Sequence, residues 1–144
     1  MNTIRPKKKW GQNFLVDLNM CKKIVSSVNT KNINEILEIG PGTGAITDLL
    51  SKKIKKITVV EIDSNLCKIL KDKKIDNLEI INQDILKTNL KSFKHKVIVG
   101  NLPYYITTPI IFKFFNSTMP WKEMYLLMQK EVGDRIVAKP GTKI

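Results

Sequence analysis

The sequence predicts an α/β fold in which a mostly parallel sheet is flanked by helices. Short apolar runs of strand length alternate with segments whose apolar residues recur at helical spacing, as in βαβ units. A glycine-rich stretch, Glu38-Ile-Gly-Pro-Gly-Thr-Gly44, follows one apolar run and precedes a helical pattern. Such turns lie at the carboxyl ends of parallel strands, where α/β sheets bind ligands. The length of 144 residues predicts one domain, spanning 1–144.

The first half of the chain predicts two strands and three helices. Asp17 is placed as the N-cap of a helix, because an apolar stripe follows it. That stripe consists of Met20, Cys21, Ile24, Val25 and Val28. The first strand is predicted at about 35–39, with a helix to about residue 53. The second strand is predicted at 57–62, and Ser64 is predicted to cap the short helix after it.

The second half of the chain continues the alternation. A turn at Asp76-Asn77 precedes a strand at 78–81, and a fourth strand at 97–100 leads into Asn101-Leu-Pro-Tyr104. Thr108-Pro109 indicates a helix cap and first turn, since proline lacks only an N–H that the helix would not use. The predicted buried face of that helix consists of Ile110, Ile111, Phe114 and Phe115. A fifth strand at 124–128 precedes a helical segment that Pro140-Gly141 ends.

Composition predicts a soluble cytoplasmic protein that does not enter a membrane. Hydrophobic residues make up 42% of the chain, and no apolar run reaches the ~18 residues of a membrane span. The basic start of the chain leads into polar residues and not into an apolar signal core. Cys21 and Cys67 lie among apolar neighbours, and with a single histidine a zinc site is not expected.

The net charge of +12 favours a polyanionic partner such as a nucleic acid. The alternative is that most lysines of this lysine-rich chain only solvate its surface. The densest cluster is Lys7, Lys8 and Lys9, which we expect to contact RNA phosphates.

The ends of the first two strands carry groups suited to a nucleoside cofactor. Gly40, Gly42 and Gly44 let a ligand approach the backbone closely. Glu61 ends the second strand about 20 residues after the glycines, the spacing at which a carboxylate meets ribose hydroxyls.

The ends of the third and fourth strands suit adenine and the transfer of a group to an amine. Asp84 can accept a hydrogen bond from an exocyclic amine, and Ile62 and Ile85 can supply apolar faces to a base. The side chain of Asn101 and the carbonyl of Leu102 can each accept an N–H bond from a target amine, which directs the nitrogen lone pair at a methyl donor.

The two remaining residues of this tetrapeptide complete a predicted methylation site. Pro103 stiffens the turn by fixing φ, and Tyr104 offers a ring on which a base stacks. In the alternative interpretation the tetrapeptide has only a structural role, as a turn that ends a strand and carries a core tyrosine.

An NAD-dependent oxidoreductase is an alternative interpretation, because Gly40-x-Gly42-x-x-Ala45 fits the dinucleotide fingerprint. That interpretation gives no role to Asn101–Tyr104 and supplies no acid or base for hydride transfer near them.

Six segments together resemble the rRNA adenine N6,N6-dimethyltransferases, in particular the bacterial small-subunit (KsgA-type) branch. They are Gln12-Asn-Phe-Leu15, the glycine stretch 38–44, Glu61, Gln83-Asp-Ile-Leu86, Asn101–Pro109 and Gln129–Ile136. The resemblance covers about 5–144 and implies a Rossmann-like, S-adenosylmethionine-dependent fold that methylates two adjacent adenines near the 3′ end of small-subunit rRNA.

The resemblance also implies roles for single residues. Asn13 and Leu15 would close over S-adenosyl-L-methionine, and Gly40 would lie against it. Glu61 would hold its ribose, and Asp84 and Ile85 would hold its adenine. Asn101 would contact the cofactor and the target amine, and Tyr104 would stack on the target base.

Members of the family continue through further strands and a helical C-terminal domain, so we expect this chain to be an incomplete, C-terminally truncated, monomeric core. The related macrolide-resistance enzymes act on large-subunit rRNA and usually carry Ile where this chain has Leu102. Leu102 thus favours the small-subunit branch, and a large-subunit substrate is an alternative. A non-catalytic rRNA-binding assembly module is a second alternative, suggested by the net charge of +12 and by the missing C-terminal part.

Overall fold

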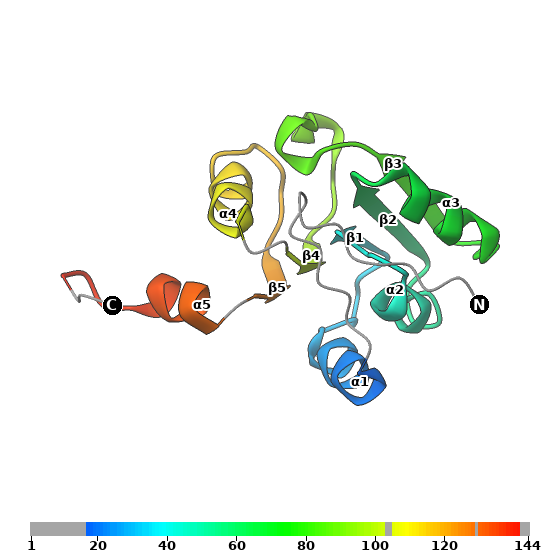
Figure 1. Ribbon diagram of the computed structural model, residues 1–144, viewed down its shortest axis with the longest axis horizontal. Helices are drawn as coiled ribbons and strands as arrows, with labels where there is room; N and C mark the ends of the chain where they lie inside the picture. Colours follow the sequence, from blue (N-terminus) through cyan, green and yellow to red (C-terminus); the bar gives the residue numbers. More distant parts are fainter. Residues whose placement is uncertain (1–16, 103–104, 129, 142–144) are drawn as a thin grey trace.

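The fold is a five-stranded, all-parallel sheet with helices on both faces (Figure 1). The computed structural model describes residues 17–102, 105–128 and 130–141. The strand order is β3-β2-β1-β4-β5, so the chain starts in the middle of the sheet and builds outward in both directions. The strands are β1 (Glu35–Ile39), β2 (Lys56–Glu61), β3 (Leu78–Asn82), β4 (Val97–Asn101) and β5 (Glu123–Leu127). The predicted α/β class is confirmed.

One face of the sheet is covered by three helices that the apolar stripes predict. They are α1 (Leu18–Ser27), α2 (Ala45–Leu50) and α3 (Ser64–Asp72). The core on this face joins helix residues such as Val25 and Leu50 to alternate strand residues such as Ile57 and Val59. Successive strand residues point to opposite faces, so every second residue of β2 enters this core.

The other face is covered by α4 (Thr107–Phe115) and by two short 3-10 turns, η2 (Ile85–Lys87) and η3 (Leu90–Ser92). Ile110 and Phe114 of α4 pack with Val60 and Ile98 of the sheet. Two cores, one on each face, therefore hold the strand ends in fixed relative positions. The last helix, α5 (Lys130–Val137), extends away from the sheet (Figure 1).

Helices α2 and α3 each differ from the sequence prediction at one end. Asp63 and not Ser64 is the N-cap of α3, since its carboxylate accepts from the N–H of Asn65 at 2.9 Å. Helix α2 ends at Leu50, because the N–H of Lys53 bonds to the Leu50 carbonyl and closes a tight turn. The prediction that Asp17 caps α1 is confirmed by its bonds to the N–H groups of Asn19 and Met20.

The buried face of α4 is narrower than the sequence predicts. Ile110 and Phe114 are 0% and 1% exposed, but Phe115 is 63% exposed and its ring packs edge-on against Trp121. The predicted cap at Thr108 is wrong, because α4 begins at Thr107 with Ile106 as its N-cap; Pro109 is the third helical residue, still within the first turn. Within the described ranges, no helix is long and apolar enough to cross a membrane.

Replacing Phe114 with Ala should lower the free energy of unfolding by about 3–5 kcal/mol, because a fully buried ring is lost from the α4 core. The matched control is Phe112→Ala on the same helix, where the ring is 61% exposed and the change should be below about 1 kcal/mol. Urea unfolding monitored by circular dichroism measures both. Equal losses would contradict the packing described for α4.

Candidate functional site

The carboxyl ends of four neighbouring strands meet at one edge of the sheet. Ile39 is paired with Val60 of β2 and with Gly100 of β4, and Val60 is paired with Ile81 of β3. The residues that follow these positions therefore lie along one edge. They are Gly40, Glu61, Asn82 and Asn101. Three of the four belong to the predicted site, and the sheet brings them together from segments far apart in the sequence.

The glycine turn requires glycine for two physical reasons. Gly40, Gly42 and Gly44 all have positive φ, which other residues rarely adopt. Close packing is the second reason, since a Cβ at Gly40 would lie 3.3 Å from the carbonyl oxygen of Asn101. A Cβ at Gly44 would lie only 2.8 Å from Cδ2 of Leu70. The turn therefore packs directly against the end of β4 and against α3.

Glu61 joins the glycine turn to the end of β2. Its carboxylate accepts from the N–H of Gly42 at 3.3 Å through Oε2 and from the N–H of Asp63 at 3.0 Å through Oε1. Glu61 is 5% exposed, and burial raises the pKa of its carboxyl, while these two hydrogen bonds oppose the rise. A carboxylate has about four acceptor positions, so Glu61 can still accept a hydrogen bond from a ligand.

The Asp84 turn is fixed by its own hydrogen bonds. The Asp84 carboxylate accepts from the N–H of Leu86 at 2.9 Å, and the Thr88 hydroxyl donates to the Asp84 carbonyl at 2.8 Å. Ile85 is only 5% exposed and packs in the α4 core, whereas Ile62 is 40% exposed at the end of β2. Of the two predicted apolar contacts to a base, Ile62 has the larger accessible surface.

Helix α4 reaches back to the Asp84 turn through one lysine. Nζ of Lys113 donates to the carbonyl of Leu86 at 2.8 Å. Burial lowers the pKa of Lys113, and the charge of Asp84 opposes that shift. We call Asn101 and Leu102, at the end of β4, the Asn101 corner. Helix α4 follows this corner and is tied by Lys113 to the turn that carries Asp84.

The Asn101 corner is anchored to the neighbouring strand. Asn101 is the last residue of β4, and the N–H of Leu102 donates to the Leu127 carbonyl of β5 at 3.2 Å. Leu102 is 4% exposed. The other predicted site residues lie outside the described residues, namely Asn13, Leu15, Pro103 and Tyr104, together with the predicted RNA contacts Lys7, Lys8 and Lys9.

Glu38 places a second buried carboxyl group beside the glycine turn. It is 2% exposed in the middle of the sheet, and the Thr47 hydroxyl of α2 donates to it at 2.6 Å. Burial raises the pKa of Glu38 to about 7, the Thr47 bond opposes this rise, and the charges of Asp48 and Glu61 add to it. Three carboxyl groups thus gather around the glycine turn.

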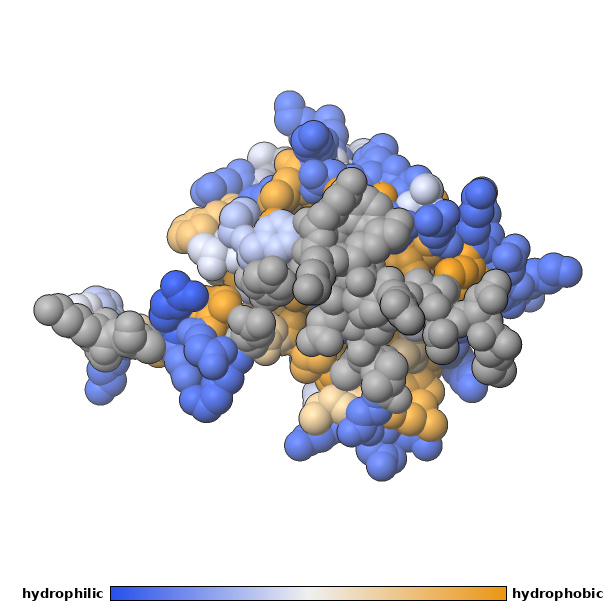
Figure 2. All heavy atoms as spheres, in the orientation of Figure 1, coloured by the Kyte–Doolittle hydropathy of each residue, from blue (hydrophilic) through white to orange (hydrophobic). Residues whose placement is uncertain are grey.

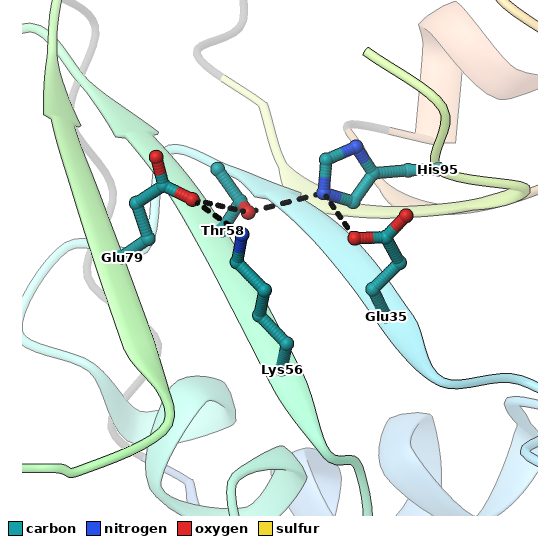
Figure 3. A network of polar contacts seen from close by, with 5 residues as sticks. All are labelled: Glu35, Lys56, Thr58, Glu79 and His95. Carbon is teal, nitrogen blue, oxygen red and sulfur yellow. Dashed lines mark hydrogen bonds and ion pairs between the residues drawn. The ribbon is translucent and has the colours of Figure 1, made fainter.

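A separate polar cluster lies at the opposite edge, where β1 and β2 begin (Figure 3). Nε2 of the buried His95 lies 3.0 Å from the Thr58 hydroxyl and 3.7 Å from the Glu35 carboxylate. Lys56 forms an ion pair with Glu79 at 2.9 Å. These residues line a cavity of about 310 Å³ together with Phe93 and its neighbours.

This cluster ties the turn before β4 to β1 and β2 and is remote from the glycine turn. The nearby Glu35 carboxylate favours a proton on Nε2 of His95, which leaves the buried Nδ1 without a partner. Burial lowers the pKa of His95, and the charge of Glu35 opposes this shift. The neutral ring therefore serves the packing of this edge. In the described part of the chain, no group of three or more His, Cys, Asp or Glu side chains could hold a metal ion.

The sequence profile of one protein family, described as Ribosomal RNA adenine dimethylase, matches residues 3–144. The chain belongs to this family. Among curated relatives, Ribosomal RNA small subunit methyltransferase A of Mesomycoplasma hyopneumoniae is 50% identical over 95% of this chain and 53% of its own length. The protein of the same name from Geobacillus thermodenitrificans is 46% identical over 95% of this chain and 50% of its own length. The chain spans about half the length of the curated relatives it matches.

Solved structures show that this member of the family has the Rossmann-like methyltransferase fold. A dimethyladenosine transferase from Plasmodium falciparum is 32% identical, with a TM-score of 0.77 over 90% of this chain and 48% of that chain. The 23S rRNA methyltransferase ErmE is 28% identical, with a TM-score of 0.74 over 85% of this chain and 50% of that chain. The family and the fold expected from the six segments are therefore confirmed.

Three residues at the site, namely Glu38, Asn82 and Lys113, have no role in the sequence prediction. A charged Glu38 within an apolar strand was the only available signal for the buried carboxyl. Asn82 donates to the Glu61 and Ile62 carbonyls at 2.9 and 3.2 Å, joining β3 to β2. The spacing of residues along the sequence could not predict the Asn82 bonds or the Lys113 bond, because each joins segments that only the fold brings together.

Glu38→Gln should change how stability depends on pH. The folded chain holds the Glu38 proton up to a pH of about 7, whereas the unfolded chain releases it near the ordinary value of 4.5. Because the folded state binds more protons between these values, wild-type stability falls as pH rises through this window. The neutral variant lacks this loss.

The gain in unfolding free energy of Glu38→Gln over wild type should therefore grow by roughly 3 kcal/mol between pH 4.5 and pH 7.5. Urea titrations across this range measure it, with the exposed Glu131→Gln as the control for loss of a carboxylate. A difference that stays constant with pH would show that Glu38 does not titrate in this way.

Proposed function

We propose that this chain is the cofactor-binding and catalytic part of an S-adenosylmethionine-dependent methyltransferase that dimethylates N6 of two adjacent adenines near the 3′ end of small-subunit rRNA. The observation that carries the proposal is the close approach of the glycine turn to Asn101, with 3.3 Å between a Cβ at Gly40 and the Asn101 carbonyl oxygen. A cofactor against Gly40 would therefore lie beside the corner that receives the target amine.

The residues present fit S-adenosylmethionine at this edge. The Glu61 carboxylate is held by two N–H donors and has acceptor positions left for the two ribose hydroxyls. Asp84 and Ile62 stand at the next strand ends for the adenine, with Ile85 packed behind them. From the sequence, Asn13 and Leu15 would cover the bound cofactor.

Local charge favours a cationic cofactor over a dinucleotide. The chain as a whole carries +12, but two acidic residues, Glu38 and Glu61, lie beside the glycine turn, while the charge of Asp48 is balanced by its ion pair with Lys73 at 2.7 Å. Carboxylates stabilise a nearby positive charge and repel a pyrophosphate. S-adenosylmethionine is positively charged at its sulfur, whereas NAD would bring its two phosphates to this turn.

The main catalytic role of the protein would be to position the target amine against the methyl group. Bound S-adenosylmethionine supplies an electrophilic methyl group. The Asn101 side-chain oxygen and the Leu102 carbonyl would accept the two N–H bonds of the adenine amine and direct its lone pair at that methyl. The Leu102 N–H is already bonded to Leu127, which fixes the corner before substrate arrives. Positioned acceptors of this kind lower the barrier because they need no rearrangement during the reaction.

Two further residues of the corner have proposed roles. Pro103 would stiffen the turn, and Tyr104 would stack on the extruded adenine, a contact that contributes about 1–3 kcal/mol per base. Lys7, Lys8 and Lys9 would contact phosphates of the rRNA. We propose that the protein acts as a cytoplasmic monomer on the small ribosomal subunit or its precursor.

Asn101→Ala should lower the rate of methylation of undermethylated small ribosomal subunits by about 100-fold or more, because one positioned acceptor is lost. Transfer of a labelled methyl group measures this rate, and the exposed Asn116→Ala is the matched control.

Calorimetry should show that wild type binds S-adenosylmethionine more tightly than NAD. Tighter binding of NAD would overturn the proposed function.

The same assay separates two alternative functions. The likeness to a 23S rRNA methyltransferase favours testing undermethylated large subunits in parallel. Faster methylation of large subunits would reassign the substrate. An Asn101→Ala variant that methylates as wild type does would remove Asn101 from the mechanism, and RNA binding without methylation by wild type would favour an assembly module.

A further inference from the structure

Two turns on the face covered by α1, α2 and α3 carry six exposed lysines. One turn follows α2 and the other lies at the end of α3, and both precede a strand. We call these six residues the lysine surface. They are Lys52, Lys53, Lys55, Lys71, Lys73 and Lys74. Figure 2 shows hydrophilic residues at the end of the molecule where Figure 1 places α3.

One asparagine holds the two turns side by side. Nδ2 of Asn77 donates to the Ser51 carbonyl at 2.9 Å and to the Ile54 carbonyl at 2.7 Å. Its own carbonyl accepts from the N–H of Ile57 at 2.9 Å. Lysines that are 16 or more residues apart in the sequence, such as Lys55 and Lys71, are therefore carried by turns in direct contact.

The lysine surface has an excess of positive charge. Lys73 forms an ion pair with Asp48 at 2.7 Å, and two exposed aspartates, Asp72 and Asp76, lie in the same segment. Six lysines and three aspartates leave an excess of three positive charges. Within the described residues, the other five lysines form no ion pair.

Lys73 connects the lysine surface to the candidate site. The side chain of Lys73 reaches the glycine turn, where a Cβ at Gly44 would lie 3.2 Å from Cε of Lys73. The other lysines lie in or beside the turns before β2 and β3, at the amino ends of these strands and therefore at the opposite end of the sheet from the Asn101 corner. A long polymer with repeated negative charges, such as an RNA, can contact this surface while one of its adenines occupies that corner.

We propose that the lysine surface binds the phosphate backbone of the RNA substrate, outside the pocket for the target adenine. This inference rests on the proposed function and extends it to a second contact with the same RNA. Lysine ammonium groups suit this role, since each is a flexible point charge that needs no fixed geometry toward phosphate. Each phosphate neutralised releases counterions, so the contact should appear in the salt dependence of binding.

A purely structural role makes a different prediction. Lysines at the end of a helix interact with its dipole and stabilise it by about 0.3–1 kcal/mol. Replacing them would then lower stability without changing how RNA affinity depends on salt. The two roles are therefore distinguished by measuring both quantities on the same variants.

The test compares two triple variants that remove the same charge from opposite faces. Lys52→Gln/Lys53→Gln/Lys74→Gln alters the lysine surface, and Lys91→Gln/Lys94→Gln/Lys96→Gln alters the turn before β4 on the α4 face. Affinity for undermethylated small ribosomal subunits is measured by filter binding at several salt concentrations. The slope of log affinity against log salt is negative, and its magnitude should decrease by about 2–3 for the first variant, since each contact contributes about 0.9. For the second variant the magnitude should decrease by less than about 1.

Equal changes in slope for the two variants, or none in either, would overturn the proposal, as would lower stability of the first variant with an unchanged slope. Calorimetry with S-adenosylmethionine and wild-type methylation are run alongside. If wild type binds S-adenosylmethionine and methylates subunits while the slopes of the two variants do not differ, only the RNA-binding role of the lysine surface is excluded. If wild type neither binds S-adenosylmethionine nor methylates subunits, the proposed function itself fails.

Discussion

The arrangement of the site depends on the hydrogen bonds that the Glu61 carboxylate accepts from the N–H groups of Gly42 and Asp63. These bonds join the first strand-to-helix turn to the second and hold a charged group at 5% exposure. A buried carboxylate needs hydrogen-bond donors to offset the loss of water, and these two N–H groups supply them. Gly42, whose N–H makes one of these bonds, has a positive φ, which favours glycine at this position.

Charge is distributed unevenly over the chain, and the distribution matches the two ligands proposed for it. Acidic groups gather around the glycine turn, where burial and mutual repulsion raise the pKa of Glu38. Lysines dominate the turns before β2 and β3, and only Lys73 of the lysine surface also reaches Asp48 beside the glycine turn. The two proposed ligands, a cationic nucleoside and a polyanionic RNA backbone, would therefore contact different regions of the chain.

The sequence predicted the strands well because each is a short apolar run that ends at a polar residue. Gly40, Glu61 and Asn101 were predicted as site residues for the same reason, since parallel strands bring their carboxyl ends to one edge. Helix details were less predictable. Asp63 and not Ser64 caps α3. Aspartate and serine both form caps, so the local sequence did not distinguish between these neighbours. Phe115 is exposed because α4 rests on the sheet along a narrow stripe.

Contacts between distant segments could not be predicted from any local pattern. The bonds of Asn77 to the turn after α2, of Asn82 to the end of β2, and of Lys113 to Leu86 each join segments that are 20 or more residues apart. Asparagine and lysine are common in this chain, so their presence alone indicates nothing. Only the fold shows which of them connect the parts of the site.

A crystal structure of this chain with bound S-adenosylmethionine tests the central claim most directly. We expect the ribose hydroxyls to occupy the remaining acceptor positions of Glu61 while the bond from Gly42 stays in place, and the methyl group to face the Asn101 corner. A cofactor bound elsewhere, or a methyl group directed away from Asn101, would contradict the account.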